Sequence, residues 1–122
     1  MKSMRPMSST SDGKGLIPRG FHVHVDCVGY IPPATDDHSW ILELMREAVR
    51  NSHAREVHAH VVPFDGSVSP PGFAAVVLID ESHVTAHCYS DRGLLAIDAF
   101  TCGKTEPEVI IDYLLHSLIE EI

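Results

Sequence analysis

The chain has 122 residues and a formal net charge of -8 at pH 7, a length that suits a single domain. The acidic balance excludes the basic surface that binding to nucleic acid or to anionic lipid requires. The three cysteines, Cys27, Cys88 and Cys102, make an odd count without a C-x-x-C pair, which excludes a dense disulfide scaffold and favours a reducing, cytoplasmic compartment.

The N-terminal segment 1–19 is rich in Ser, Met, Gly and basic residues, and it lacks the apolar central run of a secretory signal. We predict a flexible tail over 1–19 and one domain over 20–122. No stretch of the sequence approaches the roughly 20 consecutive apolar residues of a membrane-spanning helix, so no membrane association is predicted.

The domain is predicted to begin with a strand, a helix and a second strand. Polar and apolar residues alternate over 21–26, which indicates a half-buried strand. Apolar residues at helical spacing over 41–49 predict an amphipathic helix. Alternation resumes over 57–61 and ends in a Pro-, Gly- and Ser-rich loop over 63–72.

Three further strands and a second helix are predicted to follow. Residues 73–79 are apolar on both faces, which predicts an interior strand covered on both sides. Residues 83–89 and 94–100 flank a turn and form a hairpin, and an apolar stripe after a capping sequence at 105–108 predicts the last helix. Short loops favour antiparallel pairing, so we predict an α+β fold, a two-layer sandwich of an antiparallel sheet with two helices on one face.

The sheet face that the helices leave uncovered is predicted to be polar. It would collect His22, His24, Asp26, His58, His60, His83, Thr85, His87 and Asp98. Such a face is a solvent-exposed surface, a functional site, or a contact with a second subunit.

Three chemistries fit these residues when the sequence is taken alone. The two His-x-His pairs, His22 with His24 and His58 with His60, have a spacing that suits zinc ligands. Ser82 or Cys102 beside histidines has the parts of a hydrolase nucleophile, although no G-x-S-x-G elbow is present. In the third, the Ser82 hydroxyl attacks the carbonyl of Glu81 in its own chain.

The stretch around Ser82 resembles a known family, the bacterial and archaeal type of S-adenosylmethionine decarboxylase. The family patterns E-S-H-x-x-x-H and D-x-F-T-C-G are matched at their spacing, as are G-x-H-x-x-x-D-x-x-G and P-x-G. The matching residues are Gly20, His22, Asp26, Gly29, Pro70, Gly72, Glu81, Ser82, His83, His87, Asp98, Phe100, Thr101, Cys102 and Gly103.

The resemblance implies a pyruvoyl-dependent decarboxylase of polyamine synthesis. The chain would cut itself between Glu81 and Ser82, and Ser82 would become a pyruvoyl group, the only cofactor, with no metal. His87 matches the residue that assists processing, and Cys102 matches the proton donor of turnover. The substrate S-adenosylmethionine would form a Schiff base with the pyruvoyl carbonyl and lose carbon dioxide, yielding the aminopropyl donor for spermidine synthesis. The family also implies a homodimer, an αββα stack of two facing sheets.

Departures from the family pattern leave alternatives open. Ala74 stands where the family has Ser or Thr. Val68 stands where the family often has an aromatic residue that stacks on adenine. Residues Cys88 to Asp91 stand where the family has the sequence T-x-P-E. A relative that decarboxylates another amino acid, such as ornithine or arginine, would need no adenine platform. A chain that does not process itself would be a metal-binding or partner module.

Overall fold

The computed structural model describes residues 2–6, 20–33, 36–102 and 105–121. Its elements follow one another as β1 (Lys2–Pro6), β2 (Phe21–Val28), α1 (Asp37–Asn51), β3 (His58–Phe64), β4 (Gly72–Ile79), β5 (Ser82–Tyr89), the short 3₁₀ turn η1 (Ser90–Arg92), β6 (Leu94–Thr101) and α2 (Pro107–Glu121). The strands form one six-stranded sheet in the order β1-β2-β6-β5-β4-β3, and every pair is antiparallel.

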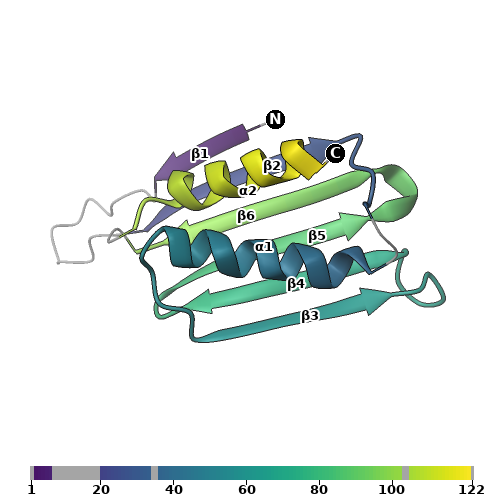
Figure 1. Cartoon of the computed structure of the whole chain (residues 1–122), viewed down its shortest axis with the longest axis horizontal. Helices are drawn as coiled ribbons and strands as arrows, with labels where there is room; N and C mark the ends of the chain where they lie inside the picture. Colours follow the sequence, from purple (N-terminus) through teal and green to yellow (C-terminus); the bar gives the residue numbers. More distant parts are fainter. Residues whose placement is uncertain (1, 7–19, 34–35, 103–104, 122) are drawn as a thin grey trace, which may run out of the picture.

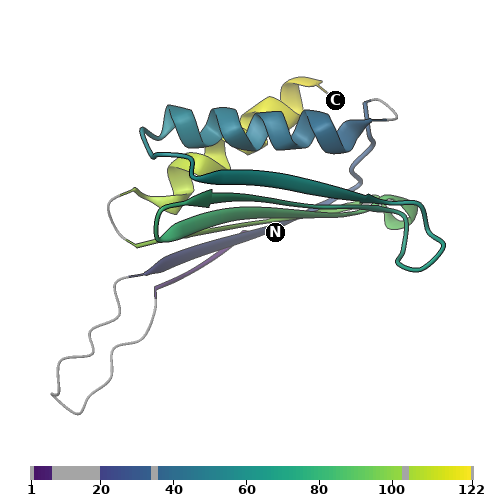
Figure 2. The ribbon, with the colours of Figure 1, turned by 90° about the horizontal axis from the view of Figure 1, so that it is seen from below.

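Both helices pack on the same face of the sheet, as Figures 1 and 2 show. The two-layer α+β prediction is confirmed. Helix α1 lies over β3 and β4, whereas α2 lies over β2 and β6, so the two helices divide the sheet between them. No helix in the part of the chain that the structure describes is long and apolar enough to cross a membrane.

The hydrophobic core lies between the sheet and the helices. Alternate residues of each interior strand point into it, and the helices contribute the stripes that their spacing predicts. Its largest fully buried side chains are Val23, Ile41, Met45, Val49, Phe73, Val77, Val84, Leu95, Ile97, Ile110, Ile111 and Leu114. Burial of this apolar surface is the main favourable contribution to folding.

The register of β4 against β5 is set where β4 begins. Gly72 has φ of +146° and pairs with Tyr89, and a Cβ atom at this position would lie 1.8 Å from the Cys88 carbonyl oxygen. Only glycine allows the two backbones to approach so closely. The same register brings Ala74 opposite His87 and Ile79 opposite Ser82.

The uncovered face, which we call the open face, consists of the remaining residues of each strand. It carries all nine of the polar residues predicted for it, together with the apolar side chains of Val28, Val62, Phe64, Val76, Leu78, Tyr89, Leu94 and Phe100. Strand β4 is interior in the sheet, but helices cover only one of its faces, and Leu78 on the other is 40% exposed. The prediction that 73–79 is covered on both sides is therefore wrong for a single protomer.

The predicted tail also differs from the structure over part of its length. Lys2–Pro6 form β1, which pairs with β2 at the edge of the sheet, and the rest of the predicted tail, 7–19, lies outside the described residues. Strand pairing uses backbone N–H and C=O groups that every residue except proline provides. A segment without alternating apolar residues can therefore add to an edge, and the pattern of 2–6 carries no sign of it.

Candidate active site

Ser82 is the first residue of β5, and its side chain points to the helix-covered face. The residue is only 8% exposed, and its Oγ accepts a hydrogen bond of 3.1 Å from the backbone N–H of Cys102. Cys102 directly follows β6, the strand that pairs with β5. The fold thus brings together two predicted site residues that are 20 positions apart in the sequence.

The peptide bond before Ser82 lies in a tight turn. Asp80 and Glu81 alone connect β4 to β5, and both are exposed. Asp80 has φ of +45°, a left-handed conformation that costs a non-glycine residue about 1–2 kcal/mol. Its carboxylate pairs with the guanidinium of Arg55, which comes from the segment after α1. The Glu81–Ser82 bond therefore lies beside a strained residue at an accessible end of the sheet.

A pocket of about 490 Å³ opens beside Ser82. Its walls come from the segment after α1, the β4–β5 turn, the end of β6 and the start of α2, and it is lined by His53, Ala54, Arg55, Ile79, Asp80, Glu81, Ser82, Thr101, Cys102, Thr105 and Ile110. Thr101 is 1% exposed, and its Oγ1 has no hydrogen-bond partner among the described residues. A buried hydroxyl without a partner is costly, so the pocket has hydrogen-bonding capacity left for a polar group.

The three cysteines are free thiols in different surroundings. Burial raises the pKa of Cys88 to about 11 and also raises that of Cys27. Both thiols therefore stay protonated near neutral pH and pack among apolar side chains. Cys102 is the thiol that lines the pocket.

His87 is not brought to Ser82 within one chain. It lies on the open face, exposed, while Ser82 points to the covered face. At about 3.3 Å per residue, the five positions between them correspond to about 16 Å along β5. The cross-strand neighbour of His87 is Ala74, one of the departures from the family pattern.

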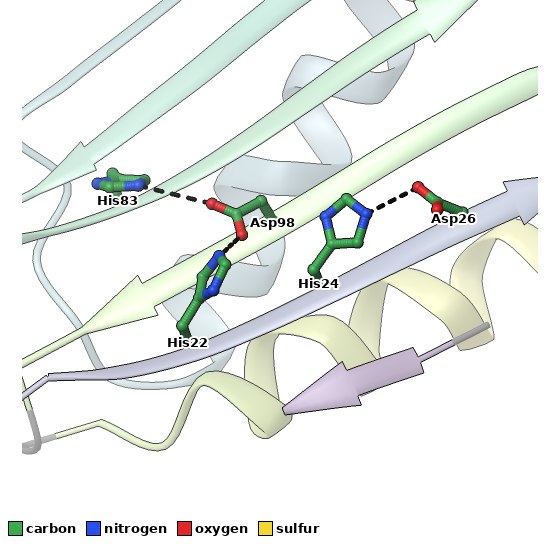
Figure 3. Close-up of polar contacts among 5 residues, drawn as sticks. All are labelled: His22, His24, Asp26, His83 and Asp98. Atoms are coloured by element: carbon green, nitrogen blue, oxygen red, sulfur yellow. Dashed lines mark hydrogen bonds and ion pairs between the residues drawn. The ribbon is translucent and has the colours of Figure 1, made fainter. Parts of the chain in front are cut away.

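Two carboxylate–imidazole groups lie on the open face, as Figure 3 shows. Asp98 on β6 pairs with His22 through Oδ1 and faces Nε2 of His83 at 3.7 Å through Oδ2. Asp26 accepts a contact of 2.8 Å from His24 on the same strand. On β3, the rings of His58 and His60 stack with centroids 6.2 Å apart.

Metal binding by these histidines gains no support. Within the described ranges, no group of three or more His, Cys, Asp or Glu side chains is arranged to hold a metal ion. The two His-x-His pairs lie on β2 and β3, at opposite sides of the six-stranded sheet. Two histidines on one strand supply fewer ligands than the four of a structural zinc site.

Several pocket residues were not predicted from the sequence. Thr101 stands inside the F-T-C-G pattern, which could have drawn attention to it. His53 and Arg55 follow a helix in a segment without a recognisable motif, and only the chain path brings them to Ser82.

The family model for S-adenosylmethionine decarboxylase matches residues 21–121 of the chain. The proenzyme of this name from Thermococcus gammatolerans is 34% identical over 97 residues, which cover 79% of this chain and 65% of the relative. The Brevibacillus brevis proenzyme is 36% identical over 103 residues, covering 84% of this chain and 74% of the relative. The chain thus spans about two-thirds to three-quarters of the length of these relatives.

A solved structure shares the fold. The crystal structure of the adenosylmethionine decarboxylase from Aquifex aeolicus superposes with a TM-score of 0.67 at 27% identity, covering 84% of this chain and 82% of the other. The relatives are named for S-adenosylmethionine, so these names do not favour the alternative substrates ornithine and arginine.

Proposed function

The chain belongs to the S-adenosylmethionine decarboxylase family, and from this premise we propose that it is a carboxy-lyase that acts on S-adenosylmethionine after cutting its own chain between Glu81 and Ser82. Its product would be decarboxylated S-adenosylmethionine, the aminopropyl donor for spermidine synthesis. We place the enzyme in the cytoplasm, where reducing conditions keep thiols such as its three free cysteines reduced.

Self-cleavage begins with the Ser82 hydroxyl. Its oxygen adds to the carbonyl carbon of Glu81, the peptide C–N bond breaks, and an ester replaces it. A base then removes the α-hydrogen of residue 82, and the Cβ–O bond breaks as the carboxylate of Glu81 leaves. Water replaces the amine of residue 82 and ammonia departs, which leaves a pyruvoyl group at the start of the new chain.

The surroundings of Ser82 suit the first of these steps. The N–H of Cys102 donates to Ser82 Oγ, which orients the hydroxyl and stabilises negative charge on its oxygen as the proton leaves. The left-handed conformation of Asp80 stores strain two residues before Ser82, which cutting the turn would release. Thr101 lines the same pocket, and its hydroxyl, which has no hydrogen-bond partner among the described residues, would donate a hydrogen bond to a carbonyl oxygen that cleavage generates.

The base for processing is assigned to His87 of a second copy. Within one chain His87 lies about 16 Å away along the strand, whereas a partner stacked on the open face would bring its own His87 to the end of the sheet where the α-hydrogen of residue 82 is removed. We propose a homodimer in which two open faces meet in an αββα stack. Exposed apolar side chains support this contact, namely Val28, Val62, Phe64, Leu78 and Tyr89.

Turnover uses the same pocket. A pyruvoyl group supplies a carbonyl that binds the substrate amine and accepts the electron pair released with carbon dioxide. Cys102 lines the pocket beside residue 82 and would return a proton to the substrate carbon. The proximity of Ser82 to Cys102 is the single observation that carries the proposal.

Cleavage and substrate are tested separately. Purified protein should separate under denaturing conditions into fragments 1–81 and 82–122, the second blocked to amine-directed sequencing and reactive towards hydrazines. Ser82→Ala should stay intact, and fragments that persist in this variant would refute the cleavage site. Carbon dioxide release is then measured with S-adenosylmethionine, ornithine and arginine, and release from either amino acid but not from S-adenosylmethionine would refute the substrate.

A separate experiment tests whether His87 of one chain acts on Ser82 of the other chain in the dimer. His87→Ala alone should remain uncut. When it is co-expressed with Ser82→Ala, mixed dimers join an intact Ser82 on one chain to an intact His87 on the other. Cleavage of the His87→Ala chain in this mixture is expected, and its absence would contradict action across the dimer.

A further inference from the structure

The start of β5 is attached to β6 on both faces of the sheet. On the covered face, the N–H of Cys102 donates to Ser82 Oγ. On the open face, the ring of His83 stacks on that of Phe100, with centroids 5.6 Å apart and an interplanar angle of 28°. Besides its pairing with Ile79 of β4, residue 82 is therefore held against β6 by one side-chain contact of its own and by the contacts of its immediate neighbour.

Asp98 ties this neighbour to a third strand. Its carboxylate lies between two imidazoles, with Oδ2 3.7 Å from Nε2 of His83 and Oδ1 paired with Nε2 of His22 (Figure 3). The Asp98 side chain is 22% exposed, less than either histidine. Because both oxygens face partners on flanking strands, the orientation of the carboxylate is restrained, and the ring of His83 lies against it at 3.7 Å.

Self-cleavage would increase the importance of this link, so the inference rests on the proposed function. The reaction would remove Oγ of Ser82 and with it the acceptor of the Cys102 hydrogen bond. It would also replace the backbone N–H of residue 82 by a carbonyl and cut the turn to β4. Chain ends fray unless they are tied down, and, beside the strand ladder from His83 onward, the side-chain contacts of His83 are those that the reaction leaves intact at this end.

We propose that Asp98 is a positioning residue, which holds the reactive end of β5 in place for turnover by keeping His83 against β6. Asp98 acts through His83 and His22 and not on residue 82 itself. The alignment of reacting groups is sensitive to small movements, since a displacement of about 1 Å can cost about 10²-fold in rate. The effect should therefore fall on kcat more than on KM.

The test removes each side of the contact in turn. Asp98→Asn keeps the size of the side chain and removes its charge, while His83→Phe keeps an aromatic ring against Phe100 and removes Nε2. Each change is expected to lower kcat about 10- to 100-fold, counted per pyruvoyl group titrated with a hydrazine, with KM changed less than twofold. The double variant should lose little more than either single one, because both break the same link. Asp98→Glu should recover part of the rate.

Asp26→Asn is the matched control, since Asp26 also pairs with a histidine on the open face but lies opposite Ala96 of β6, four positions along that strand from Phe100, the cross-strand neighbour of His83. Its kcat should stay within twofold of the wild type. A wild-type kcat in Asp98→Asn, additive losses in the double variant, or an equal loss in Asp26→Asn would overturn the inference, as would a loss explained by dissociation of the dimer. If Asp98→Asn fails to fold, His83→Phe carries the test. An uncut wild-type chain counts instead against the proposed function.

Discussion

The two faces of the sheet have the same backbone and opposite chemistry. On the covered face of β4, β5 and β6 every residue is buried, and all are apolar except Ser82 and Thr101 at the end that carries the pocket. On the open face, histidines and carboxylates are interspersed with exposed apolar side chains. The contrast suggests different roles for the two faces. The covered face stabilises the protomer and carries the proposed nucleophile, and the open face is the one we propose for the partner subunit and for positioning.

The largest expected effect compares residues with similar side chains on the two faces. Ile97 on β6 is 2% exposed on the covered face, and Leu78 on β4 is 40% exposed on the open face. Ile97→Ala should lower the free energy of unfolding by about 2–5 kcal/mol, since it leaves a cavity in the core. Leu78→Ala should cost less than about 1 kcal/mol in a dilute monomer. Denaturant titration of both variants measures the difference, and equal losses would mean that the open face is buried in the protomer.

Cys102→Ala tests whether the covered face carries the turnover chemistry. General acids contribute typically about 10²–10⁴-fold, so carbon dioxide release should fall at least about 10²-fold while self-cleavage continues. Cys27→Ala is the control, because that thiol is protonated and lies outside the pocket. Turnover at the wild-type rate in Cys102→Ala would remove the thiol from the mechanism.

Leu78→Lys tests the open face as a subunit contact. A charge placed in an apolar contact must lose its hydration on association, so the dimer dissociation constant should rise at least about tenfold, or about 1.4 kcal/mol. Analytical ultracentrifugation measures the constant, and Val109→Lys on an exposed position of α2 serves as the control. A dimer that Leu78→Lys leaves unchanged would place the contact elsewhere.

Ala74→Ser is expected to increase function. Ala74 lies opposite His87 on the open face, at the position where the family has Ser or Thr. Directly opposed side chains in antiparallel strands have Cβ atoms about 4.5–5.5 Å apart, which allows a new hydroxyl to contact the imidazole. Self-cleavage should become several-fold faster in a time course of the purified precursor. An unchanged rate would show that His87 works without this hydroxyl.

The smallest effect concerns alkaline stability. Burial raises the pKa of Cys88 from its ordinary value of 9.0 to about 11. The unfolded chain therefore loses the thiol proton at lower pH than the native protein, and the contribution of Cys88 to stability is present below pH 9 and lost as the pH rises towards 11. Unfolding titrations at pH 8 and pH 10 should show a smaller decline in Cys88→Ala than in the wild type. An equal decline in both would assign it to other groups.

The sequence pattern predicted most of the covered face correctly. Alternation at Val23 and Val25 and helical spacing at Ile41, Met45 and Val49 reflect burial against neighbours, and burial is a strong constraint on residue type. It predicted β1 poorly, because pairing at a sheet edge depends on backbone groups that leave no side-chain pattern. It also predicted two covered faces for β4, because an apolar run does not indicate whether the cover comes from the same chain or from another.

The sequence by itself determined the order of the elements from residue 21 onward, the polar character of the open face and the residues whose chemistry matches a family. The tertiary structure decided which of those residues meet. The family pattern links Ser82 and His87 in processing, but a strand turns successive side chains to opposite faces, so an offset of five residues separates them within one chain. Cys102, 20 positions from Ser82, meets it because β5 and β6 pair in antiparallel register. Proximity in a sheet follows from register and face, and both depend on the packing of the whole chain.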